Sequence, residues 1–537
     1  MEMHKNSNNK KIQVWLPLLF ALVMVAGMTL GYLLRGNSSQ TRGILMLPGK
    51  RSPLQEVVDL VNAKYVDPIT DTLNGDMAQA MLAKLDPHSV FIPAADLSEI
   101  NEDLQGNFQG IGVEFQIFND TVNVINVLQG GPSEKAGLQV GDKFVKVGDS
   151  VVAGNKITNA RIRNLLRGPG ASKVLVTMMR NGKLQQFTIN RGLIPIPSID
   201  ASYKLDSSTG YIRINKFSET TYEEFMSSLE KLQKQHISQL VLDLRGNGGG
   251  ILTEAVDIAD EFLDGNKLIV YTQGDKMPRQ EYRCKRDGIF EKGKLVVLVD
   301  ENSASASEVL TGALQDWDRA TIVGRRTFGK GLVQEQYDLS DGAALRLTVA
   351  RYYTPSGRSI QKPYTHDGNG EYGNDLLKRY QHGELVNADS NKVQNGKAYQ
   401  TKSGRTVYGG GGIMPDIFVP FDTSVISASV NKVLSRTTVS NFVYQYYIQN
   451  KSELSAYRSG VEFAQKFNKE EDMWNAFANF ASKDSLSVNS ISTKDKDFLK
   501  DHLKALLGRQ IWRTEGLYEI LNADDEMIKK ALEAVKK

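Results

Sequence analysis

The chain has 537 residues, too many for one compact domain, so three or four domains are expected. Hydrophobic residues make up 41% of it, as in globular proteins, and a formal net charge of +3 argues against a nucleic-acid-binding surface. One cysteine excludes an intramolecular disulfide, and six scattered histidines without metal-ligand spacing argue against a metal site.

A long apolar segment follows a short polar N-terminus. Residues 1–11 are polar and basic, and residues 12–34 are almost wholly apolar, which is long enough to span a bilayer. No small-residue cleavage site follows this segment, so we expect an uncleaved signal anchor rather than a cleaved signal peptide. Basic residues flank both of its ends, so the positive-inside rule does not fix its orientation. Residues 35–50 are predicted to be a linker.

Residues 51–106 are predicted to form a helical region. Apolar residues recur at helical spacing over residues 54–65 and again over residues 77–85. The LDPHS sequence of residues 85–89 ends the second helix through its proline. His88 in this sequence is either a turn residue at the helix end, which we favour, or the base of a Ser-His pair.

Glycine-rich turns and short strands characterise residues 107–193. The sequence GIGV at 110–113 begins the run, GPSEKAGL follows at 131–138, and a short helix is predicted over residues 162–166. This pattern resembles a PDZ domain, which implies that a substrate C-terminus is received by Gly110, Ile111, Gly112 and Val113. A glycine-rich loop can present N–H groups to a carboxylate, and the adjacent sheet edge can accept a peptide as an added strand. The alternative is a PDZ domain that binds nothing and only packs on the core.

Strands and helices alternate from Ser198 onward. Strands are predicted over residues 210–214 and 240–244, and amphipathic helices over residues 221–234 and 251–263. The glycine-rich junction of residues 245–250 lacks the lysine of a P-loop and the spacing of a dinucleotide-binding loop. A phosphate-binding role is therefore not favoured.

The stretch from Lys294 to Gln334 holds the candidate catalytic residues. A buried strand is predicted over residues 295–299, and helical spacing of apolar residues begins after SASASE at 303–308. Ser305 therefore lies where a strand gives way to a helix, and N–H groups there can stabilise an oxyanion. Lys330 lies between two glycines and among apolar residues, where a lowered pKa would suit a general base. The alternative is an ordinary helix start and a surface turn.

The last part of the chain contains two further motifs and a region without motifs. The motifs are YTPSGRSIQ at 353–361 and GGIMPD at 411–416, separated by a polar stretch over residues 366–402 that is predicted to be an exposed insertion or loop. Residues 425–537 have recurring helical patterns with mixed charges, which indicates a soluble helical domain.

These motifs together resemble the active-site region of the carboxy-terminal processing proteases, also called tail-specific proteases. The resemblance covers about residues 50–420 and rests on SASASE, TFGKGLVQ and the motifs around them. It implies an α/β (α+β) catalytic core over residues 194–424 with an inserted PDZ domain. In this family the nucleophile, the base and the residue that orients the base would be Ser305, Lys330 and Gln334. The oxyanion would be held by the backbone N–H of Ala306 with that of either Gly248 or Gly249.

The resemblance also carries expectations about location and partners. These proteases act outside the cytoplasm, which implies a single-pass protein of the inner (cytoplasmic) membrane with residues 1–11 cytoplasmic and the catalytic part periplasmic. The expected partners are protein or peptide substrates with free C-termini, the membrane through residues 12–34, and either a second copy of the chain or an adaptor protein. No nucleic acid, metal or cofactor is implied. Arg167, after the PDZ helix, is the candidate relay between an occupied PDZ domain and the protease core.

Two other functions were weighed against proteolysis. A proteolytically inactive PDZ scaffold at the membrane is the main alternative, and the intact Ser305, Lys330 and Gln334 argue against it. An α/β-hydrolase esterase would need a GxSxG sequence, which is absent around Ser305.

Overall fold

The structure is a computed structural model that describes residues 21, 23–25, 53–64, 71–365, 370–388, 396–422, 427–484, 486–488 and 491–536. The chain divides into two units, residues 1–74 and residues 75–537. The first unit contains helix α2 (Pro53–Lys64), and helix α3 (Asp71–Leu82) begins within it. Across the described ranges, no helix is both long and apolar enough to cross a membrane. The predicted tail at 1–11, the linker at 35–50 and all but four residues of the predicted anchor at 12–34 lie outside those ranges.

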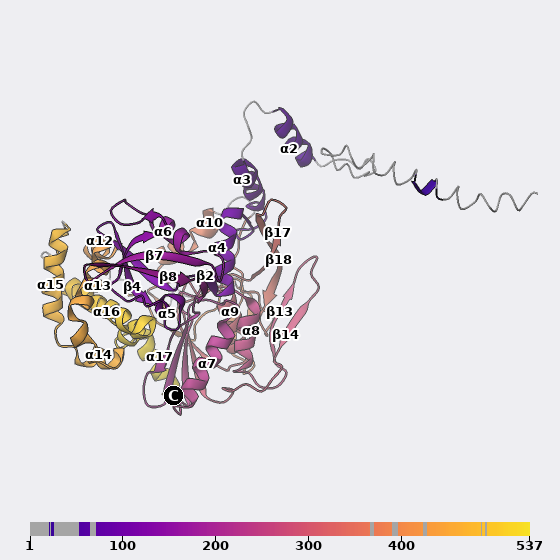
Figure 1. The fold of residues 1–537 in the computed structure, drawn as a ribbon. Coiled ribbons are helices and arrows are strands. Elements are labelled where there is room, and N and C mark those ends of the chain that lie inside the picture. The colour runs from indigo at the N-terminus through magenta and orange to yellow at the C-terminus, as the bar shows by residue number, and fades with distance from the viewer. Residues whose placement is uncertain are drawn as a thin grey trace, which may run out of the picture. The chain divides into compact units, whose positions relative to one another are not determined.

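The second unit contains a six-stranded sheet, which lies near α7 (Thr221–Gln233) and α17 (Glu526–Lys536) in Figure 1. Its strands follow the order β10-β11-β12-β15-β16-β21; only the β10–β11 pair is antiparallel. The strand bounds are β10 (Ile199–Lys204), β11 (Thr209–Ile214), β12 (Gln239–Asp243), β15 (Lys294–Val299), β16 (Thr321–Gly324) and β21 (Ile417–Phe418). Because β12 and β15 are parallel neighbours, the loops after their carboxyl ends meet at one edge of the sheet, where α/β proteins typically bind ligands.

Helices cover both faces of this sheet. One face packs against α7 (Thr221–Gln233), α8 (Leu252–Asp260) and α9 (Ala306–Asp316) through a large apolar cluster that includes Phe225, Leu242 and Val297. The opposite face packs against α17 (Glu526–Lys536), whose Met527, Ile528, Ala531 and Val535 contact Val296 and Leu298. Strands buried on both faces are apolar throughout, as in the sequence LVVLV of β15.

A second sheet brings the chain's N-terminal part beside the catalytic core. It has the order β1-β18-β13-β14, and β17 also pairs with β18. The bounds are β1 (Val90–Ile92), β13 (Leu268–Gln273), β14 (Gln280–Arg283), β17 (Leu332–Asp338) and β18 (Ala344–Tyr353). Helix α4 (Ala94–Gln105) follows β1 and precedes the PDZ region. Strand β17 carries Gln334, so this sheet positions part of the candidate site.

The PDZ region contains a sheet of order β3-β4-β5-β7-β8, with β6 paired to β5. Strand β3 is therefore an edge strand. The bounds are β3 (Val113–Phe118), β4 (Thr121–Val127), α5 (Pro132–Lys135), β5 (Lys143–Val147), β6 (Ser150–Val151), α6 (Asn159–Leu166), β7 (Lys173–Arg180) and β8 (Lys183–Asn190). An antiparallel ribbon of β2 (Asn107–Gly110) and β9 (Gly192–Pro195) closes the region where the chain enters and leaves it.

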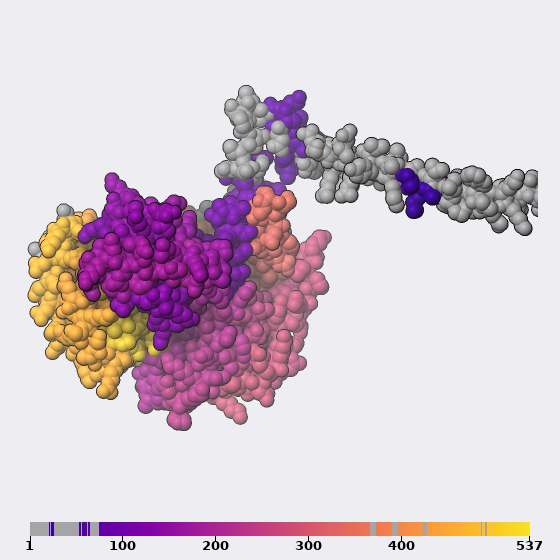
Figure 2. Space-filling model, viewed as in Figure 1, coloured from indigo at the N-terminus to yellow at the C-terminus, as the bar shows by residue number. Residues whose placement is uncertain are grey.

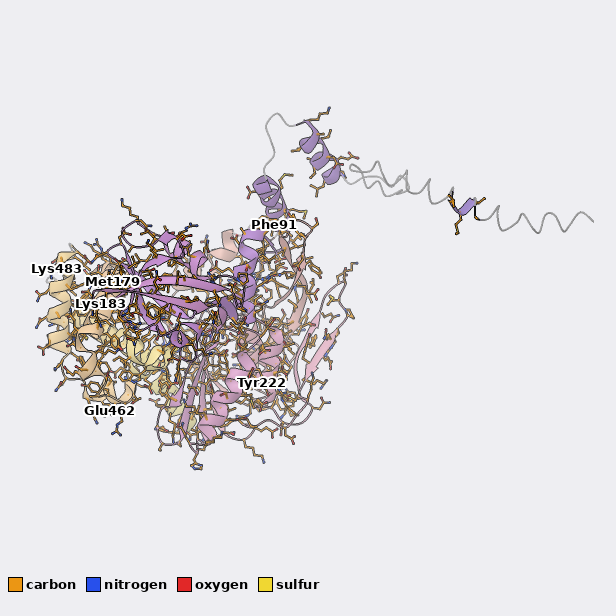
Figure 3. All side chains as sticks on the ribbon, in the orientation of Figure 1. Phe91, Met179, Lys183, Tyr222, Glu462 and Lys483 are labelled. Carbon is orange, nitrogen blue, oxygen red and sulfur yellow. The ribbon has the colours of Figure 1, made fainter. Side chains whose placement is uncertain are left out.

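The C-terminal helices form an apolar cluster of their own and also contact the PDZ sheet. The helices are α12 (Ala428–Leu434), α13 (Thr438–Leu454), α14 (Gly460–Lys466), α15 (Glu470–Lys483) and α16 (Thr493–Leu521). Arg513 pairs with Glu114 of β3 at 2.6 Å, and the rings of Phe118 and Tyr444 lie 5.0 Å apart. Figure 2 shows these helices against the PDZ surface, and Figure 3 labels Met179 and Lys183 of the PDZ region. Helix α17 lies instead on the catalytic sheet, so the region after residue 425 packs in two places.

The described part of the polar stretch over residues 366–402, predicted to be an exposed insertion or loop, is largely exposed and contains regular elements. It contains α10 (Gly370–Gly373), α11 (Asp375–Gln381) and β19 (Ala398–Gln400), which pairs with β20 (Thr406–Tyr408). Arg379 is buried there and donates to Glu384 at 2.8 Å and to the Arg326 carbonyl at 2.6 Å. The burial of this one arginine was not predicted, because one of its contacts, the Arg326 carbonyl, is remote in sequence.

Candidate active site

Ser305 lies at a strained turn between β15 and α9. Its backbone has φ 56° and ψ −116°, a conformation that non-glycine residues rarely adopt and that concentrates at functional sites. Ala306 is the first residue of α9, so the N-terminus of the helix, with the Ala306 N–H, lies at this turn. Gly249 packs directly on the turn: a Cβ there would lie 2.7 Å from the Ser305 Cβ and from the Ala304 oxygen. Only glycine fits this approach.

A buried carboxylate, Glu308, joins the Ser305 turn to the Lys330 loop. Its oxygens accept hydrogen bonds from the backbone N–H groups of Ser305 at 2.9 Å, Gly329 at 2.7 Å and Lys330 at 2.8 Å, and from the Thr327 hydroxyl at 2.5 Å. Burial raises the pKa of Glu308 to about 7, although the four hydrogen bonds act in the opposite direction. One side chain thus fixes the relative position of both candidate catalytic residues.

Tyr352 of β18 reinforces this connection. Its hydroxyl donates to the Lys330 carbonyl at 2.5 Å and lies 3.1 Å from the Ser305 carbonyl oxygen. The side chain is buried, and burial raises its pKa well above the usual tyrosine range. The hydroxyl therefore remains a protonated donor between the two loops at any working pH.

Lys330 is partly buried beside Gln334. Its Nζ donates to the Gln334 Oε1 at 2.9 Å. Burial, and next the positive charge of Arg346, hold the pKa of Lys330 below the lysine value of 10.5, while Asp86 and Glu308 oppose the shift. A lysine with a lowered pKa is neutral in a larger fraction of molecules and can accept a proton.

Gln334 is held in turn by the LDPHS turn. Its Nε2 donates to the His88 carbonyl at 2.5 Å. Asp86 fixes this turn by accepting from the His88 and Ser89 N–H groups at 2.8 and 2.9 Å and from the Thr348 hydroxyl at 3.0 Å. The His88 ring bonds to the Tyr372 hydroxyl at 2.7 Å, and burial, with Lys330 next, lowers its pKa to about 4. His88 thus positions Gln334 through its backbone carbonyl, while its ring is hydrogen-bonded to Tyr372 and not to Ser305.

The glycine loop after β12 offers one free N–H beside that of Ala306. The Gly249 N–H donates to the Asn247 Oδ1 at 2.8 Å, so it is already engaged. Among the hydrogen bonds of the described residues, none uses the N–H of Gly248 or of Ala306. Nothing lies within 4 Å of a Cβ built on Gly248. Of the two pairs that the sequence left open, Gly248 with Ala306 therefore suits an oxyanion better.

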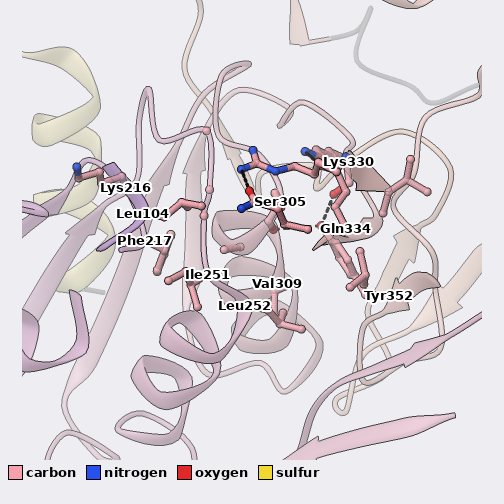
Figure 4. A pocket seen from close by; sticks show the side chains of 18 of the residues that line it. Leu104, Lys216, Phe217, Ile251, Leu252, Ser305, Val309, Lys330, Gln334 and Tyr352 are labelled. Carbon is pink, nitrogen blue, oxygen red and sulfur yellow. Dashed lines mark hydrogen bonds between the residues drawn. The ribbon is translucent and has the colours of Figure 1, made fainter. Parts of the chain in front are cut away.

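These residues border one cavity of about 520 Å³, shown in Figure 4. Ser305, Lys330 and Gln334 project into it, with Gly248, Gly249 and Ala306 at its wall. Its apolar lining is contributed by Leu104, Phe217, Ile251, Leu252, Val309, Leu332 and Val333. The remaining charged lining residues are Asp103, Lys216 and Arg346. Among the described residues, no group of three or more His, Cys, Asp and Glu side chains could hold a metal ion.

The predicted peptide-binding and relay residues lie outside this cavity. Gly110 ends β2 and Val113 begins the edge strand β3; Gly112 between them has φ 73°, which favours glycine. Arg167 follows α6, donates to the Glu102 Oε2 at 2.9 Å and lies over the Phe108 ring at 4.6 Å. Glu102 belongs to α4, the helix that also contributes Asp103 and Leu104 to the cavity. Arg167 therefore contacts an element of the catalytic cavity from the PDZ side.

Three residues of the site were not predicted from the sequence. Glu308 carried a signal, because Ser305 and Glu308 have the S-x-x-E spacing of a capping box. Tyr352 and Arg346 carried none, since they reach the site only through the pairing of β18 with β1 and β17.

Comparison with known proteins places these features in families. Peptidase family S41 matches residues 208–367, the PDZ domain family matches residues 109–190, and a family of unknown function matches residues 429–513. The chain is 34% identical over 314 residues to the "Carboxy-terminal-processing protease" of Bartonella bacilliformis, a match that covers 57% of this chain and 71% of that protein. It is 32% identical over 372 residues to a "Probable CtpA-like serine protease" of Staphylococcus epidermidis, covering 66% of this chain and 73% of the relative.

Among the solved structures similar to this chain is that of a photosystem II D1 C-terminal processing protease. The two are 31% identical with a TM-score of 0.34, and the match covers 57% of this chain and 83% of that one. The matched S41 segment contains Ser305, Lys330 and Gln334, and the matched PDZ segment contains the GIGV loop. The Bartonella bacilliformis protein is more than 30% identical to this chain over more than two thirds of its own length. The chain therefore belongs to the carboxy-terminal-processing proteases of peptidase family S41, serine-type peptidases, and carries a PDZ domain.

Proposed function

We propose that the protein is an endopeptidase that works through a Ser-Lys dyad. The Ser305 Oγ attacks the substrate carbonyl while neutral Lys330 takes its proton, and an acyl-enzyme ester forms. Protonated Lys330 gives that proton to the leaving amine. Water then hydrolyses the ester, with Lys330 again accepting a proton. The N–H groups of Gly248 and Ala306 hold the oxyanion, a contribution of about 3 kcal/mol for each donor.

The observation that carries this proposal is the environment of Lys330. Its amine lies in the Ser305 cavity, where burial and Arg346 favour the neutral form, and Gln334 accepts one of its hydrogen bonds. Gln334 is itself fixed by the His88 carbonyl, so the amine has a defined position. The test is Ser305-dependent cleavage: the full chain should hydrolyse an unfolded protein or an unstructured peptide, and Ser305→Ala should not. Equal turnover by both proteins would contradict the proposal.

The PDZ domain supplies substrate selection in this proposal. Strand β3 lies at the edge of its sheet, where an extended peptide can add as a further strand, with the GIGV loop of residues 110–113 at its start. Protein or peptide substrates with a free C-terminus would be captured there. The Arg167–Glu102 contact connects the helix beside this edge to α4 and hence to the cavity. Binding and catalysis would be coupled by about 1–3 kcal/mol.

Substrate selection predicts a difference between two forms of one substrate. A peptide with a free, apolar C-terminus should be cleaved about tenfold faster at low concentration than its C-terminal amide, because the charged carboxylate accepts the N–H groups of the loop more strongly than a neutral amide oxygen does. Arg167→Ala should reduce this preference. Arg163→Ala is the matched control, since Arg163 lies in the last turn of α6, just before Arg167, and pairs with Glu99 of α4 at a more exposed position. Equal rates for both peptides, unchanged on deletion of residues 107–193, would show that the domain neither selects nor gates.

Residues 12–34 supply a membrane anchor in this proposal, with the catalytic part outside the cytoplasm. The support is their apolar character over a length sufficient for a bilayer. The full chain should therefore remain with the membrane after washing in high salt or alkaline carbonate and be extracted by detergent. Protease added to intact cells stripped of any outer membrane should digest the catalytic part. Recovery of a soluble protein whose N-terminus lies beyond residue 34 would contradict the anchor.

A further inference from the structure

The catalytic cavity contains a cation that the mechanism above does not use as a reacting group. Arg346 of β18 lines the cavity together with Lys330, Gln334 and Gln336. Its Nη2 donates to the Gln336 Oε1 at 3.1 Å. Among the ion pairs of the described residues, none includes Arg346. The guanidinium is half-buried, and burial lowers its pKa, so its charge has lost part of its hydration without gaining a carboxylate partner.

The other charged groups of the cavity do not neutralise Arg346. Lys216 and Asp103 pair with each other at 2.6 Å, so their charges cancel. Among the described residues that line the cavity, Lys330 is the only further charged one, and it is either neutral or positive. The cavity wall therefore carries a net positive charge, which is focused where solvent is partly excluded.

A guanidinium in this setting suits one class of ligand. It stays charged at every working pH and presents five N–H donors in a planar fork that matches a carboxylate in two parallel bonds. Such charge-assisted bonds strengthen as water is excluded. The amide oxygen of Gln336 holds one side of the fork and fixes its plane, leaving further donors for a ligand.

We propose that Arg346 forms an anion subsite of the catalytic cavity that binds a carboxylate of the substrate. The inference rests on the proposed proteolytic function and names a substrate feature for it. The carboxylate belongs either to a glutamate or aspartate side chain near the scissile bond or to the substrate's own C-terminus. In both cases Arg346 acts by binding substrate, while the apolar wall around Val309 and Leu252 receives uncharged side chains.

Binding to an inactive protein tests the subsite without relying on turnover. The full chain with Ser305→Ala is titrated with amidated peptides in which one glutamate replaces glutamine at successive positions on either side of the cleavage site. At one position glutamate should lower Kd by about tenfold. Arg346→Gln, added to Ser305→Ala, should reduce that ratio to about one. Arg351→Gln is the matched control: it lies on the same strand but is exposed, and it should keep the ratio.

A second set of peptides distinguishes the two sources of the carboxylate. These peptides contain no acidic side chain and differ only in whether their C-terminus is free or amidated. The part of the preference for the free acid that Arg346→Gln removes is due to the cavity. The part that remains is due to the PDZ domain. Equal Kd values for glutamate and glutamine at every position, combined with an Arg346-independent preference for the free acid, would overturn the subsite. A glutamate preference that survives Arg346→Gln would overturn it equally. If the full chain showed no Ser305-dependent cleavage but the binding experiment still showed an Arg346-dependent preference for a carboxylate, the dyad would be refuted and the subsite would not.

Discussion

Replacing Lys330 by methionine should lower kcat for peptide cleavage by about a thousandfold or more, and Ser305→Ala should have the same effect. Methionine fills the space of the lysine chain but accepts no proton, so the Ser305 hydroxyl would have to react without a base. Lys330→Arg should be equally inactive, because arginine keeps its proton at every working pH. Single-turnover cleavage of a fluorogenic peptide measures each variant.

The control for these variants is Lys294→Met, at the exposed start of β15, which should retain wild-type kcat. Thermal unfolding should show that all four proteins remain folded. Combining Ser305→Ala with Lys330→Met should cost little more than either change alone, since both residues serve one step. Cleavage by Lys330→Met within tenfold of wild type would exclude Lys330 as the base.

Glu308→Gln should lower kcat by about a hundredfold while KM changes little. The amide group has one acceptor oxygen where the carboxylate has two, so at least one N–H of the Ser305 turn or the Lys330 loop loses its partner. A displacement of about 1 Å between the two loops suffices for a loss of that size. Steady-state kinetics with one peptide gives kcat and KM separately.

Glu301→Gln is the matched control for this positioning role. Glu301 is also a buried glutamate after β15, but its carboxylate pairs with Arg325 at 2.6 Å. Breaking that pair should lower the unfolding temperature and leave kcat of the folded protein nearly unchanged. If Glu308→Gln lost stability in the same proportion as activity, Glu308 would be a structural residue rather than one that positions the dyad.

The sequence predicted the parts of the site that lie in continuous motifs. Ser305 and Lys330 were candidates from their residue types and the strand, turn and helix signals around them, and the resemblance of SASASE and TFGKGLVQ to the tail-specific proteases implied their roles and that of Gln334. The structure brings all three into one cavity. The choice between Gly248 and Gly249 could not be made from the sequence, because it depends on which N–H the Asn247 side chain accepts from.

Other features depend on contacts between distant segments and left no pattern in the sequence. The carbonyl of His88 holds Gln334 although 246 residues separate them, and the role of His88 there is a backbone role that no side-chain motif encodes. Helix α17 covers the catalytic sheet, and its apolar positions look the same as those of a helix in a separate domain. Arg346 has an ordinary strand context; only the pairing of β18 brings it to the cavity.

The most direct test of the Ser-Lys dyad is the pH dependence of Ser305 reactivity. A fluorophosphonate forms a bond between its phosphorus and the Ser305 Oγ and releases fluoride, and the attack requires a base to take the hydroxyl proton. The labelling rate should rise with pH as Lys330 loses its proton, and it should level off once Lys330 is neutral. Because the pKa of Lys330 is lowered, the midpoint of this rise should lie below pH 10.5. Mass spectrometry should place the label on Ser305, and Lys330→Met should abolish the pH-dependent rise. Labelling at another residue, or an unchanged rate and pH profile in Lys330→Met, would contradict the dyad.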